Sequence, residues 1–347
     1  MTFRVLHIHD VANVAYWLVR GLRKIGVAAE ILAPRTFKAS SFYMSWLRPQ
    51  SYIHLVESSS TFGLIKELGE HKDYDIYHAH YCLSPIVACA LRNLPFVAHS
   101  HGSDLRTVAK KMKYRYFIKL SLKRAEKVLV STPDLIFHAK HVGVTNPVFF
   151  PNPVPDIFKP SKSKIDLLED RFEYVIFHPS RIVWDLKGTD KLVYAFKKVV
   201  ERHNARLVLI NYGEDLEKTK KLVRELNLTE RVLFVDPIPQ YTMPEYYNAS
   251  DIVAAQFNVG HVGLVGLESF ACTKPVVADY RFPEYYGELP VLKANTIDEI
   301  ASQIVKLVEN PEMGIELAKR GLNYVERHHA LDTVTKRLLD IYREILQ

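Results

Sequence analysis

Runs of apolar, β-branched residues alternate with segments of helical periodicity along this sequence, and that alternation constrains the fold more than any other feature. The first half contains seven such runs: RVLHIHD (4–10), VAAEILA (27–33), IHLVE (53–57), DIYHAHY (75–81), PFVAHSH (95–101), KVLVS (127–131) and PVFFP (147–151). Continuously apolar strands that alternate with helices are typical of a parallel sheet with helices on both faces. We therefore expect an α/β domain here.

Residues 151–163, PNPVPDIFKPSKS, interrupt the alternation with four prolines and several polar residues, as expected of a linker. A second alternating set then runs from YVIFHPS (174–180) to PVVA (275–278), and helical segments end the chain. The length of 347 residues also favours two domains. The sequence thus predicts two doubly wound domains. Ligands of such domains bind beyond the carboxyl ends of the strands, so we expect the site in the cleft between the domains.

Composition indicates a cytoplasmic protein. No stretch of about 18 apolar residues is present, and MTFRVLHIHD leads into a strand pattern rather than the layout of a signal peptide. Cys82, Cys89 and Cys272 lie in apolar contexts without paired spacing. That pattern favours buried thiols over disulfides or a zinc site.

Charge is distributed unevenly along the chain. Residues 1–160 carry 21 Lys and Arg against 11 Asp and Glu, a net charge of +10, whereas the remainder carries 25 against 28, a net charge of −3. This asymmetry suggests that the first half faces something anionic. Phosphates, a membrane surface and nucleic acid all remain open on charge alone.

Several segments in order resemble the family 4 glycosyltransferases, which have the GT-B fold of two Rossmann-like domains facing a central cleft. In the second half these are SRIVWDLKGTDKLVYAFKKV, LVLINYGED, RVLFVDPIPQYTMPEYYNASDIVAA and GHVGLVGLESFACTKPVVA. HAHY, VAHSHGSDLR and FFPNPVPDIFKP resemble landmarks of the first half. The resemblance implies an acceptor-side domain over 1–160, a nucleotide-sugar domain over 161–329, and a last helix, about 330–347, that packs back on the first domain.

The resemblance also implies a retaining, metal-independent glycosyltransferase that moves a sugar from a nucleotide-sugar donor to a saccharide or lipid-linked acceptor. Arg181 and Lys187 match positions that neutralise the leaving diphosphate, for which a guanidinium fork and an ammonium group are suited. His101 stands where the family's histidine contacts the donor sugar. These three are the candidate catalytic residues; the alternatives are a solvated loop pair and a hydrogen-bonded histidine at a strand end.

The remaining candidates would bind the donor. Gly263, Leu264 and Val265 open a helix predicted over 262–272, whose free N–H groups favour an anion. Glu268 matches the family's ribose-binding glutamate, although a structural hydrogen bond would also explain it. The other predicted contacts are Asn13, through its amide, and Asn211 and Ile238, which we expect to influence donor specificity.

The pattern departs from the family at three places. Gly260 replaces the first glutamate of the signature, which the family places beside the donor sugar. Ala12 and Val14 lie in a loop where many members have glycines, and Thr273 replaces another glycine. An alternative is therefore a catalytically inactive GT-B homologue that acts as a nucleotide-binding or regulatory subunit.

Three His-x-His pairs leave a metal site open as another alternative. Residues two apart on a strand face the same side, so His7 with His9, His78 with His80, and His99 with His101 could each chelate a metal. Carboxylates near the pairs are sparse apart from Asp10 and Asp104. We expect neither a metal nor another cofactor.

Residues 110–124, KKMKYRYFIKLSLKR, contain seven basic residues and no acid. As a helix this segment would have an apolar stripe of Tyr116, Phe117 and Leu120 and a basic face, like a peripheral membrane element at the inner face of the membrane. Alternatively, one face packs on the sheet and the charges are solvated. RTFKASSFYMSWLRP (35–49) adds aromatic residues with positive charges. Nucleic acid is not expected, because no recognition motif accompanies the charge.

Overall fold

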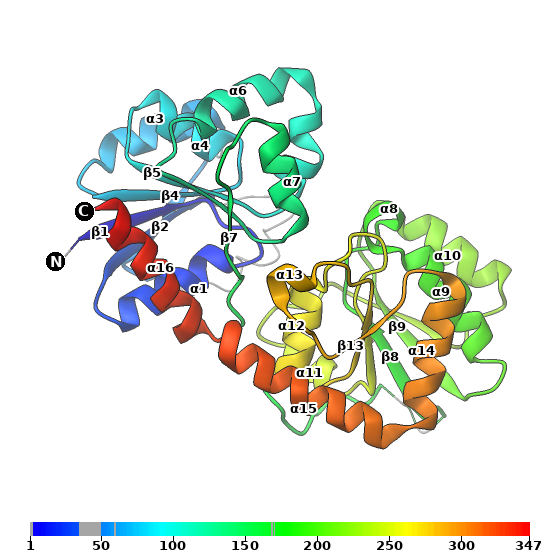
Figure 1. The fold of residues 1–347 in the computed structure, drawn as a ribbon. Coiled ribbons are helices and arrows are strands. Elements are labelled where there is room, and N and C mark those ends of the chain that lie inside the picture. The colour runs from blue at the N-terminus through cyan, green and yellow to red at the C-terminus, as the bar shows by residue number, and fades with distance from the viewer. Residues whose placement is uncertain (1–2, 35–49, 59, 168, 170) are drawn as a thin grey trace. The chain divides into compact units, whose positions relative to one another are not determined.

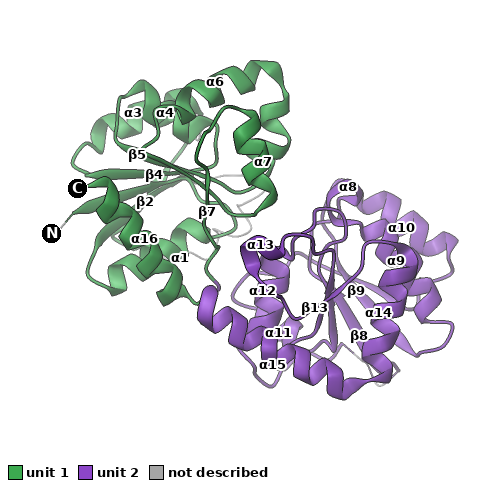
Figure 2. Ribbon diagram, viewed as in Figure 1, with its two compact units in different colours: residues 1–153, 330–347 green, residues 154–329 purple. Residues whose placement is uncertain are grey.

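The computed structural model describes residues 3–34, 50–58, 60–167, 169 and 171–347, which form two compact units (Figure 2). Unit 1 comprises residues 1–153 and 330–347, and unit 2 comprises residues 154–329. The sequence placed the first boundary at 160, so the later part of the predicted linker belongs to unit 2. The aromatic segment 35–49 lies outside the described residues.

Unit 1 contains a parallel sheet in the order β3-β2-β1-β4-β5-β6-β7 (Figure 1). Its strands are β1 (Arg4–Ile8), β2 (Ala28–Pro34), β3 (Ile53–Val56), β4 (Ile76–His80), β5 (Phe96–Ser100), β6 (Lys127–Val130) and β7 (Val148–Phe149). Its helices are α1 (Val14–Lys24), α3 (Thr61–Glu70), α4 (Ser84–Leu91), α5 (Ser103–Arg106), η1 (Val108–Lys110), α6 (Met112–Leu122), α7 (Asp134–His141) and α16 (Leu331–Ile345).

The pleat of these strands divides their side chains between two faces of the sheet. Leu6, Ile8 and Ala79 belong to the hydrophobic core beneath α3, α4 and α6. The alternate positions carry buried histidines, and α1 and α16 cover that opposite face (Figure 1). Apolar alternation thus explains one face, whereas the other face is polar and still buried.

Unit 2 contains a second parallel sheet, in the order β10-β9-β8-β11-β12-β13. Its strands are β8 (Tyr174–His178), β9 (Ala205–Ile210), β10 (Val232–Val235), β11 (Ile252–Ala254), β12 (Val276–Ala278) and β13 (Val291–Lys293). Its helices are α8 (Trp184–Lys187), α9 (Thr189–Val199), α10 (Leu216–Glu225), α11 (Met243–Asn248), α12 (Gly263–Ala271), α13 (Pro283–Tyr286), α14 (Ile297–Glu309) and α15 (Pro311–His328).

A short helix that the sequence did not predict precedes α9. The sequence predicts a helix over 188–202, which is found as α9, and Gly188 adopts a left-handed φ of 66° between it and the short α8. Glycine accepts this backbone conformation without steric cost, so it ends one helix and precedes the next. The break leaves Lys187 at the last position of α8.

Strand order fixes where each unit has its topological switch point. The chain reverses its direction of travel across the sheet between β1 and β4 in unit 1, and between β8 and β11 in unit 2. Ligands of doubly wound folds bind just beyond the carboxyl ends of the strands at such points. The residues that follow these strands are therefore the ones to examine.

Candidate functional site

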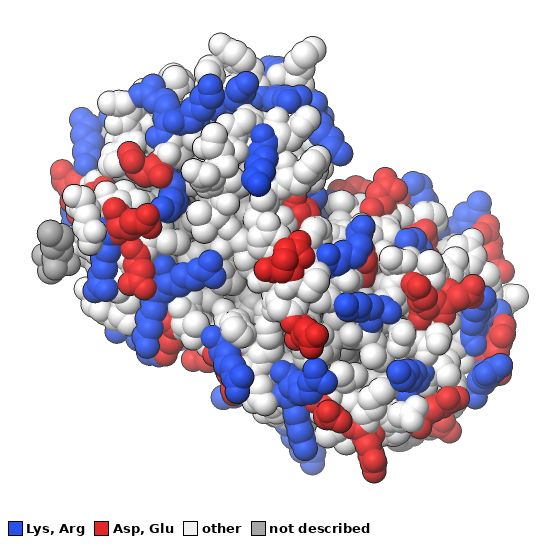
Figure 3. Space-filling model, in the orientation of Figure 1, with Lys and Arg blue, Asp and Glu red and all other residues white. Residues whose placement is uncertain are grey.

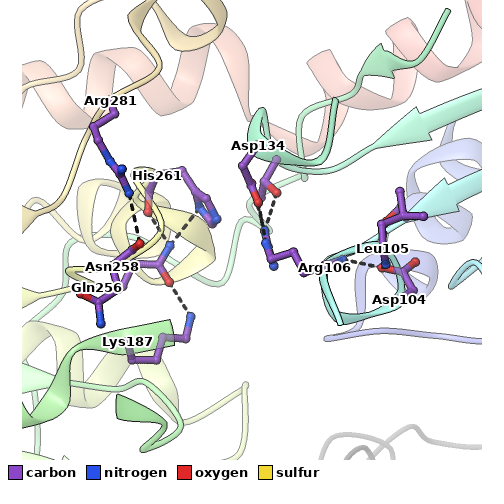
Figure 4. A network of polar contacts seen from close by, with 12 residues as sticks. Asp104, Leu105, Arg106, Asp134, Lys187, Gln256, Asn258, His261 and Arg281 are labelled. Carbon is purple, nitrogen blue, oxygen red and sulfur yellow. Dashed lines mark hydrogen bonds and ion pairs between the residues drawn. The ribbon is translucent and has the colours of Figure 1, made fainter. Parts of the chain in front are cut away.

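Three cations contact the segment that follows β11 in unit 2. Lys187 Nζ donates to Gln256 Oε1 at 2.5 Å, and Lys191 Nζ donates to Asn258 Oδ1 at 2.6 Å. Arg281, which follows β12, donates from Nη2 to the Asn258 carbonyl at 3.1 Å (Figure 4). We call Lys187, Lys191 and Arg281 the unit 2 cation cluster. Residues from α8, from α9 and from the segment after β12 thus place positive charge at the switch point.

Helix α12 begins beside this cluster without a side-chain cap and without an acid in its first turn. Gly263 has a φ of 63°, and a Cβ there would lie 3.2 Å from Gln256 Nε2. Glycine is therefore favoured by both backbone conformation and space. The first N–H groups of a helix have no intrahelical partner and carry partial positive charge, and Leu264 and Val265 are half-exposed. Such a helix start favours an anion.

Gln256 links the cluster to the helix start. Its Nε2 lies 2.9 Å from His261 Nδ1 and also donates to the His261 carbonyl, while its Oε1 accepts from Lys187 (Figure 4). Gln256 is 1% exposed. This buried amide orients the lysine ammonium toward the start of α12.

Arg181 is more exposed than Lys187. Its Nη2 lies 2.8 Å from Glu214 Oε1, with 41% and 62% of the two side chains exposed. Ion pairs of such exposure contribute little to stability, so the guanidinium can exchange its partner cheaply. Arg181 follows β8, at the same carboxyl edge as Gln256.

Glu268 lies inside α12 and is nearly fully buried. Tyr247 Oη donates to Glu268 Oε2 at 2.9 Å, and Gln240 also hydrogen-bonds the carboxyl. Burial raises the pKa of Glu268 to about 8, against the two hydrogen bonds, which lower it. The carboxyl is thus mostly protonated at pH 7, and it makes the structural hydrogen bond that the sequence left open.

Asn211 and Ile238 follow the neighbouring strands β9 and β10. The Asn211 N–H donates to the Val235 carbonyl at 2.7 Å, whereas its buried Oδ1 has no hydrogen-bond partner among the described residues. Ile238 is 5% exposed. One unpaired amide oxygen and one apolar side chain are suited to a flat heterocyclic ring.

Glycine is the residue type that fits at position 260. It has a φ of 74°, and a Cβ there would lie 2.7 Å from Arg281 Nε and 3.0 Å from a ring carbon of Phe282. The Arg281 N–H donates to the Gly260 carbonyl at 2.9 Å, and Arg281 Nη2 lies 2.9 Å from Asp279 Oδ2. A guanidinium therefore occupies the space into which a side chain at 260 would project.

The switch point of unit 1 has a different character. Asp10 accepts from the N–H groups of Ala15 and Tyr16, at 3.0 and 3.4 Å, so an acid caps the start of α1. Burial raises the pKa of Asp10 to about 7. Ala12 and Asn13 adopt φ values of 52° and 60°. This loop, in which many members of the resembled family have glycines, thus takes left-handed conformations with other residues, a strain that is common at functional sites.

His101 follows β5 in a loop that Asp104 holds together. The Asp104 carboxylate accepts from Cys82 N, Ser100 Oγ, Gly102 N and Leu105 N at 2.8 to 3.0 Å. Both ring nitrogens of His101 are engaged: Nε2 lies 2.9 Å from His80 Nδ1, and Nδ1 lies 2.8 Å from Ser131 Oγ. Burial lowers the pKa of His101 to about 4, so the imidazole is neutral at pH 7.

Arg106, the last residue of α5, forms a bidentate ion pair with Asp134, the first residue of α7. Arg106 donates from Nε and Nη2 to the two carboxylate oxygens, at 2.5 and 3.0 Å, and from Nη2 to Thr132 at 2.8 Å (Figure 4). Both partners of the ion pair are largely buried. A paired guanidinium of this kind fixes the loop after β5 against α7.

The three His-x-His pairs do not act as three separate chelates. His9 has a φ of 71° and stacks on Tyr81, whereas the other five histidines come together on one face of the sheet. Two groups, His7 with His78 and His80, and His80 with His99 and His101, bring ring nitrogens within 4.8 Å of one another. However, the rings of His78 and His80 stack at 8°, and those of His80 and His101 at 15°. Lone pairs in parallel planes do not converge on one ion, as a tetrahedral site requires.

Helix α6 carries an exposed apolar and basic surface. Met112, Tyr116, Phe117 and Leu120 are 86%, 63%, 50% and 45% exposed, and Ile118 packs inward. Lys and Arg side chains gather along the edge of unit 1 that contains α6 (Figure 3). The stripe predicted from the sequence is therefore solvent-exposed. In the described residues no helix combines the length and hydrophobicity needed to cross a bilayer.

The sequence analysis did not identify four residues at the carboxyl edge of the unit 2 sheet: Gln256, Asn258, Lys191 and Arg281. Gln256 and Asn258 are polar residues directly after the apolar run DIVAA, a signal that could have found them. Lys191 and Arg281 have no such local signal, because their role depends on which segments the sheet brings beside β11.

Two known protein families match this chain. Residues 161–324 match the family described as glycosyl transferases group 1, and residues 11–156 match Glycosyltransferase Family 4. N-acetyl-alpha-D-glucosaminyl L-malate synthase of Bacillus anthracis is 22% identical over 81% of this chain and 77% of its own length. An uncharacterized glycosyltransferase of Methanocaldococcus jannaschii is 25% identical over 86% and 83%.

Solved structures share the fold. Sucrose-phosphate synthase from Thermosynechococcus elongatus has a TM-score of 0.77 at 17% identity, over 99% of both chains. HepE of Anabaena, solved in complex with UDP-glucose, has a TM-score of 0.77 at 16% identity, over 98% of this chain and 99% of its own. The predicted fold class, two Rossmann-like doubly wound domains of the GT-B type, is confirmed.

Proposed function

We propose a donor, a reaction course and an acceptor for this chain, which belongs to the group 1 glycosyltransferases. It moves a sugar from a nucleotide-sugar donor to a saccharide or lipid-linked acceptor, with retention at the sugar carbon and without a metal ion. HepE in complex with UDP-glucose supports the donor class. The predicted enzyme class, a glycosyltransferase, is confirmed by the family matches.

The unit 2 cation cluster beside the uncapped start of α12 carries the proposal. A nucleotide diphosphate gains negative charge when it leaves, and ammonium, guanidinium and helix N–H groups stabilise that charge without a divalent ion. Lys187 and Arg181 bind the diphosphate together with the N–H groups of Gly263–Val265. Cations fixed by buried partners need little reorganisation during the reaction.

The remaining predicted contacts complete the proposed donor site. Asn211 and Ile238 take the base, and Glu268 takes the ribose by exchanging its bond to Tyr247. Asn13 and His101 belong to unit 1; the Asn13 amide binds the donor near its phosphates, and His101 contacts the donor sugar. The acceptor attacks the same face of the sugar that the diphosphate leaves.

Calorimetry with UDP, GDP, ADP and their sugar derivatives, with and without chelator, tests this function. We expect one nucleotide to bind in chelator, and Lys187→Ala to weaken binding and slow turnover by about a hundredfold. Lys198→Ala is the matched control, because Lys198 lies on the exposed face of α9 and pairs with Asp298 of α14. Equal losses in both variants would refute the assignment of Lys187.

Two further outcomes separate the alternatives. Binding of free nucleotide with no added affinity from any sugar, and no turnover, would support the inactive nucleotide-binding homologue that Gly260 suggests. Loss of activity in chelator would contradict metal independence.

We also propose that α6 contacts an anionic membrane surface at the inner face of the membrane, in support of a lipid-linked acceptor. Its exposed aromatic residues and lysines match the composition of interfacial helices. Replacing Lys110, Lys111 and Lys113 by Glu should abolish sedimentation with phosphatidylserine vesicles, whereas replacing Lys218, Lys220 and Lys221 on α10 should not. Unchanged sedimentation of the first variant would discard the contact.

A further inference from the structure

Seven side chains of unit 1 are joined end to end by hydrogen bonds: Tyr342, His7, His80, His101, Ser131, His99 and His78. We call this set the histidine ring. Its members come from β1, β4, β5, the segments after β5 and β6, and α16. All are buried except His101, which is half-buried. Such a set must satisfy its hydrogen bonds internally.

Half of the ring runs from Tyr342 to His101. Tyr342 Oη lies 3.2 Å from His7 Nε2, and His7 Nδ1 lies 2.9 Å from His80 Nε2. His80 Nδ1 then lies 2.9 Å from His101 Nε2. Each histidine here bonds to the preceding member of the ring through Nε2 and to the following member through Nδ1.

The other half returns from His101 to Tyr342. His101 Nδ1 lies 2.8 Å from Ser131 Oγ, and Ser131 Oγ lies 3.2 Å from His99 Nε2. His99 Nδ1 lies 3.1 Å from His78 Nε2, and His78 Nδ1 lies 2.6 Å from Tyr342 Oη. The ring closes, and it passes through these histidines in the same Nε2-to-Nδ1 sense.

Proton counting then restricts the ring to two arrangements. A neutral imidazole offers one N–H and one acceptor nitrogen, and a hydroxyl offers one O–H and can accept. Five imidazoles and two hydroxyls supply seven protons for seven hydrogen bonds. Every bond is made only if all donate around the ring in one direction.

We propose that the histidine ring is proton-ordered, so that all five histidines are neutral and share one tautomer, either all Nδ1–H or all Nε2–H. Tyr342 and Ser131 are the positioning residues that close the ring and keep His101 in the same tautomer as the other four histidines. The tautomer claim stands without the proposed function, whereas its effect on His101 in catalysis rests on that function. Burial lowers the pKa of each of these histidines, which agrees with neutral rings.

A competing arrangement uses the Ser100 carbonyl. Ser131 Oγ lies 2.9 Å from that oxygen and could donate to it. His99 and His101 would then both donate to Ser131, and both histidine neighbours of Tyr342 would present acceptor nitrogens to its single proton. One buried acceptor would be unpaired, which costs about 1 to 3 kcal/mol. The Ser100 carbonyl already accepts from Ser131 N at 3.0 Å, so it does not need the hydroxyl.

Long-range ¹H–¹⁵N correlation of the histidine rings at pH 7, on the full chain without donor, tests the proposal. We expect the five ring histidines to show one tautomer, with no doubly protonated ring. A mixed set, in which His99 and His78 differ from the other three, would overturn the proposal. So would a shift of these signals at one equivalent of zinc, since it would indicate a metal site instead.

Tyr342→Phe provides a sharper test. Without the hydroxyl, the one-tautomer arrangement leaves a buried N–H unpaired, whereas the competing arrangement leaves only acceptors unpaired and adds the bond to Ser100. Unpaired buried donors are the rarer case. We expect His99 and His78 to change tautomer in this variant if the wild-type ring is all Nδ1–H. If it is all Nε2–H, we expect His7, His80 and His101 to change instead. An unchanged pattern would show that ring closure does not set the tautomers.

Ser131→Ala and Ser131→Thr separate the ring from the proposed function. Loss of the hydroxyl should slow turnover by about tenfold without weakening nucleotide binding, and threonine should restore the rate. A hundredfold loss would correspond to a displaced reacting group rather than to an altered tautomer. Uniform tautomers without nucleotide binding would refute the function and leave the ring, whereas nucleotide binding with mixed tautomers would refute the ring.

Discussion

The carboxyl edges of the two sheets differ in charge, and each differs from the net charge of its part of the chain. Residues 1–160 have a net charge of +10, yet their switch point has the acids Asp10 and Asp104 and neutral histidines. The rest of the chain has a net charge of −3, yet its switch point has the cation cluster. The charge of a ligand site is therefore a local property of the residues after the strands.

The difference follows from whether an acidic side chain accepts hydrogen bonds from the N–H groups at the start of a helix. In unit 1 the carboxylates of Asp10 and Asp104 accept from N–H groups at the starts of α1 and α5. In unit 2, α12 has no such acid. A capped helix start is already satisfied, whereas an uncapped one retains its attraction for an anion. Four substitutions test this contrast.

The largest effect is expected for Asp104→Ala. Three backbone N–H groups and the Ser100 hydroxyl lose their buried acceptor, and the free energy of unfolding should fall by about 4 kcal/mol. Urea denaturation measures it. Asp332→Ala, an exposed acid paired with Lys24, should change stability by less than about 1 kcal/mol. Equal stabilities of the two variants would show that the acid of unit 1 is not a structural cap.

A smaller effect is expected for Glu268→Gln, and it depends on pH. The folded-state pKa of about 8 lies above the ordinary 4.5, so between these values the unfolded chain ionises while the folded carboxyl stays protonated. Stability of the wild type therefore falls as pH rises from 4.5 to 8, by on the order of 3 kcal/mol at pH 7. The variant should lack this fall in denaturation curves at pH 4 and pH 7. Parallel pH dependences would contradict a buried neutral Glu268.

Gly263→Ala should cost about 2 kcal/mol of stability, from its left-handed φ and the contact with Gln256. Gly26→Ala is the matched control, because Gly26 has a φ of 85° with no atom within 4 Å of the added Cβ. Thermal denaturation compares their stabilities. Only Gly263→Ala should also weaken nucleotide binding, and equal binding by both variants would remove the anion from the start of α12.

The smallest effect on stability is expected for Arg181→Ala. The ion pair with Glu214 is exposed, so its loss should change the free energy of unfolding by less than about 1 kcal/mol. Glu214→Ala should behave alike in denaturant. If Arg181→Ala lost several kcal/mol, the guanidinium would be a structural group and not one available to a ligand.

Much of the fold followed from the sequence, because strand and helix periodicities are local. Continuous apolar runs marked the strands of both sheets, and the resemblance marked Arg181, Lys187 and Glu268. The helix predicted over 188–202 is found as α9, but the short helix α8 before it was not predicted, since only the backbone shows how Gly188 divides the two. Arg281 was missed for another reason: its contact with the turn after β11 depends on strand order.

The histidines show most clearly what the sequence determines and what the tertiary structure determines. The sequence by itself placed three His-x-His pairs at strand ends and, through the period of two, predicted that each pair shares one side. That prediction holds for His78 with His80 and for His99 with His101, whereas His9 turns away from His7 and stacks on Tyr81. Only the tertiary structure brought β1, β4 and β5 side by side and laid Tyr342 of α16 across them. Periodicity is a property of one segment, whereas hydrogen bonds between segments depend on how the sheet orders them, and that order is decided by packing over the whole unit.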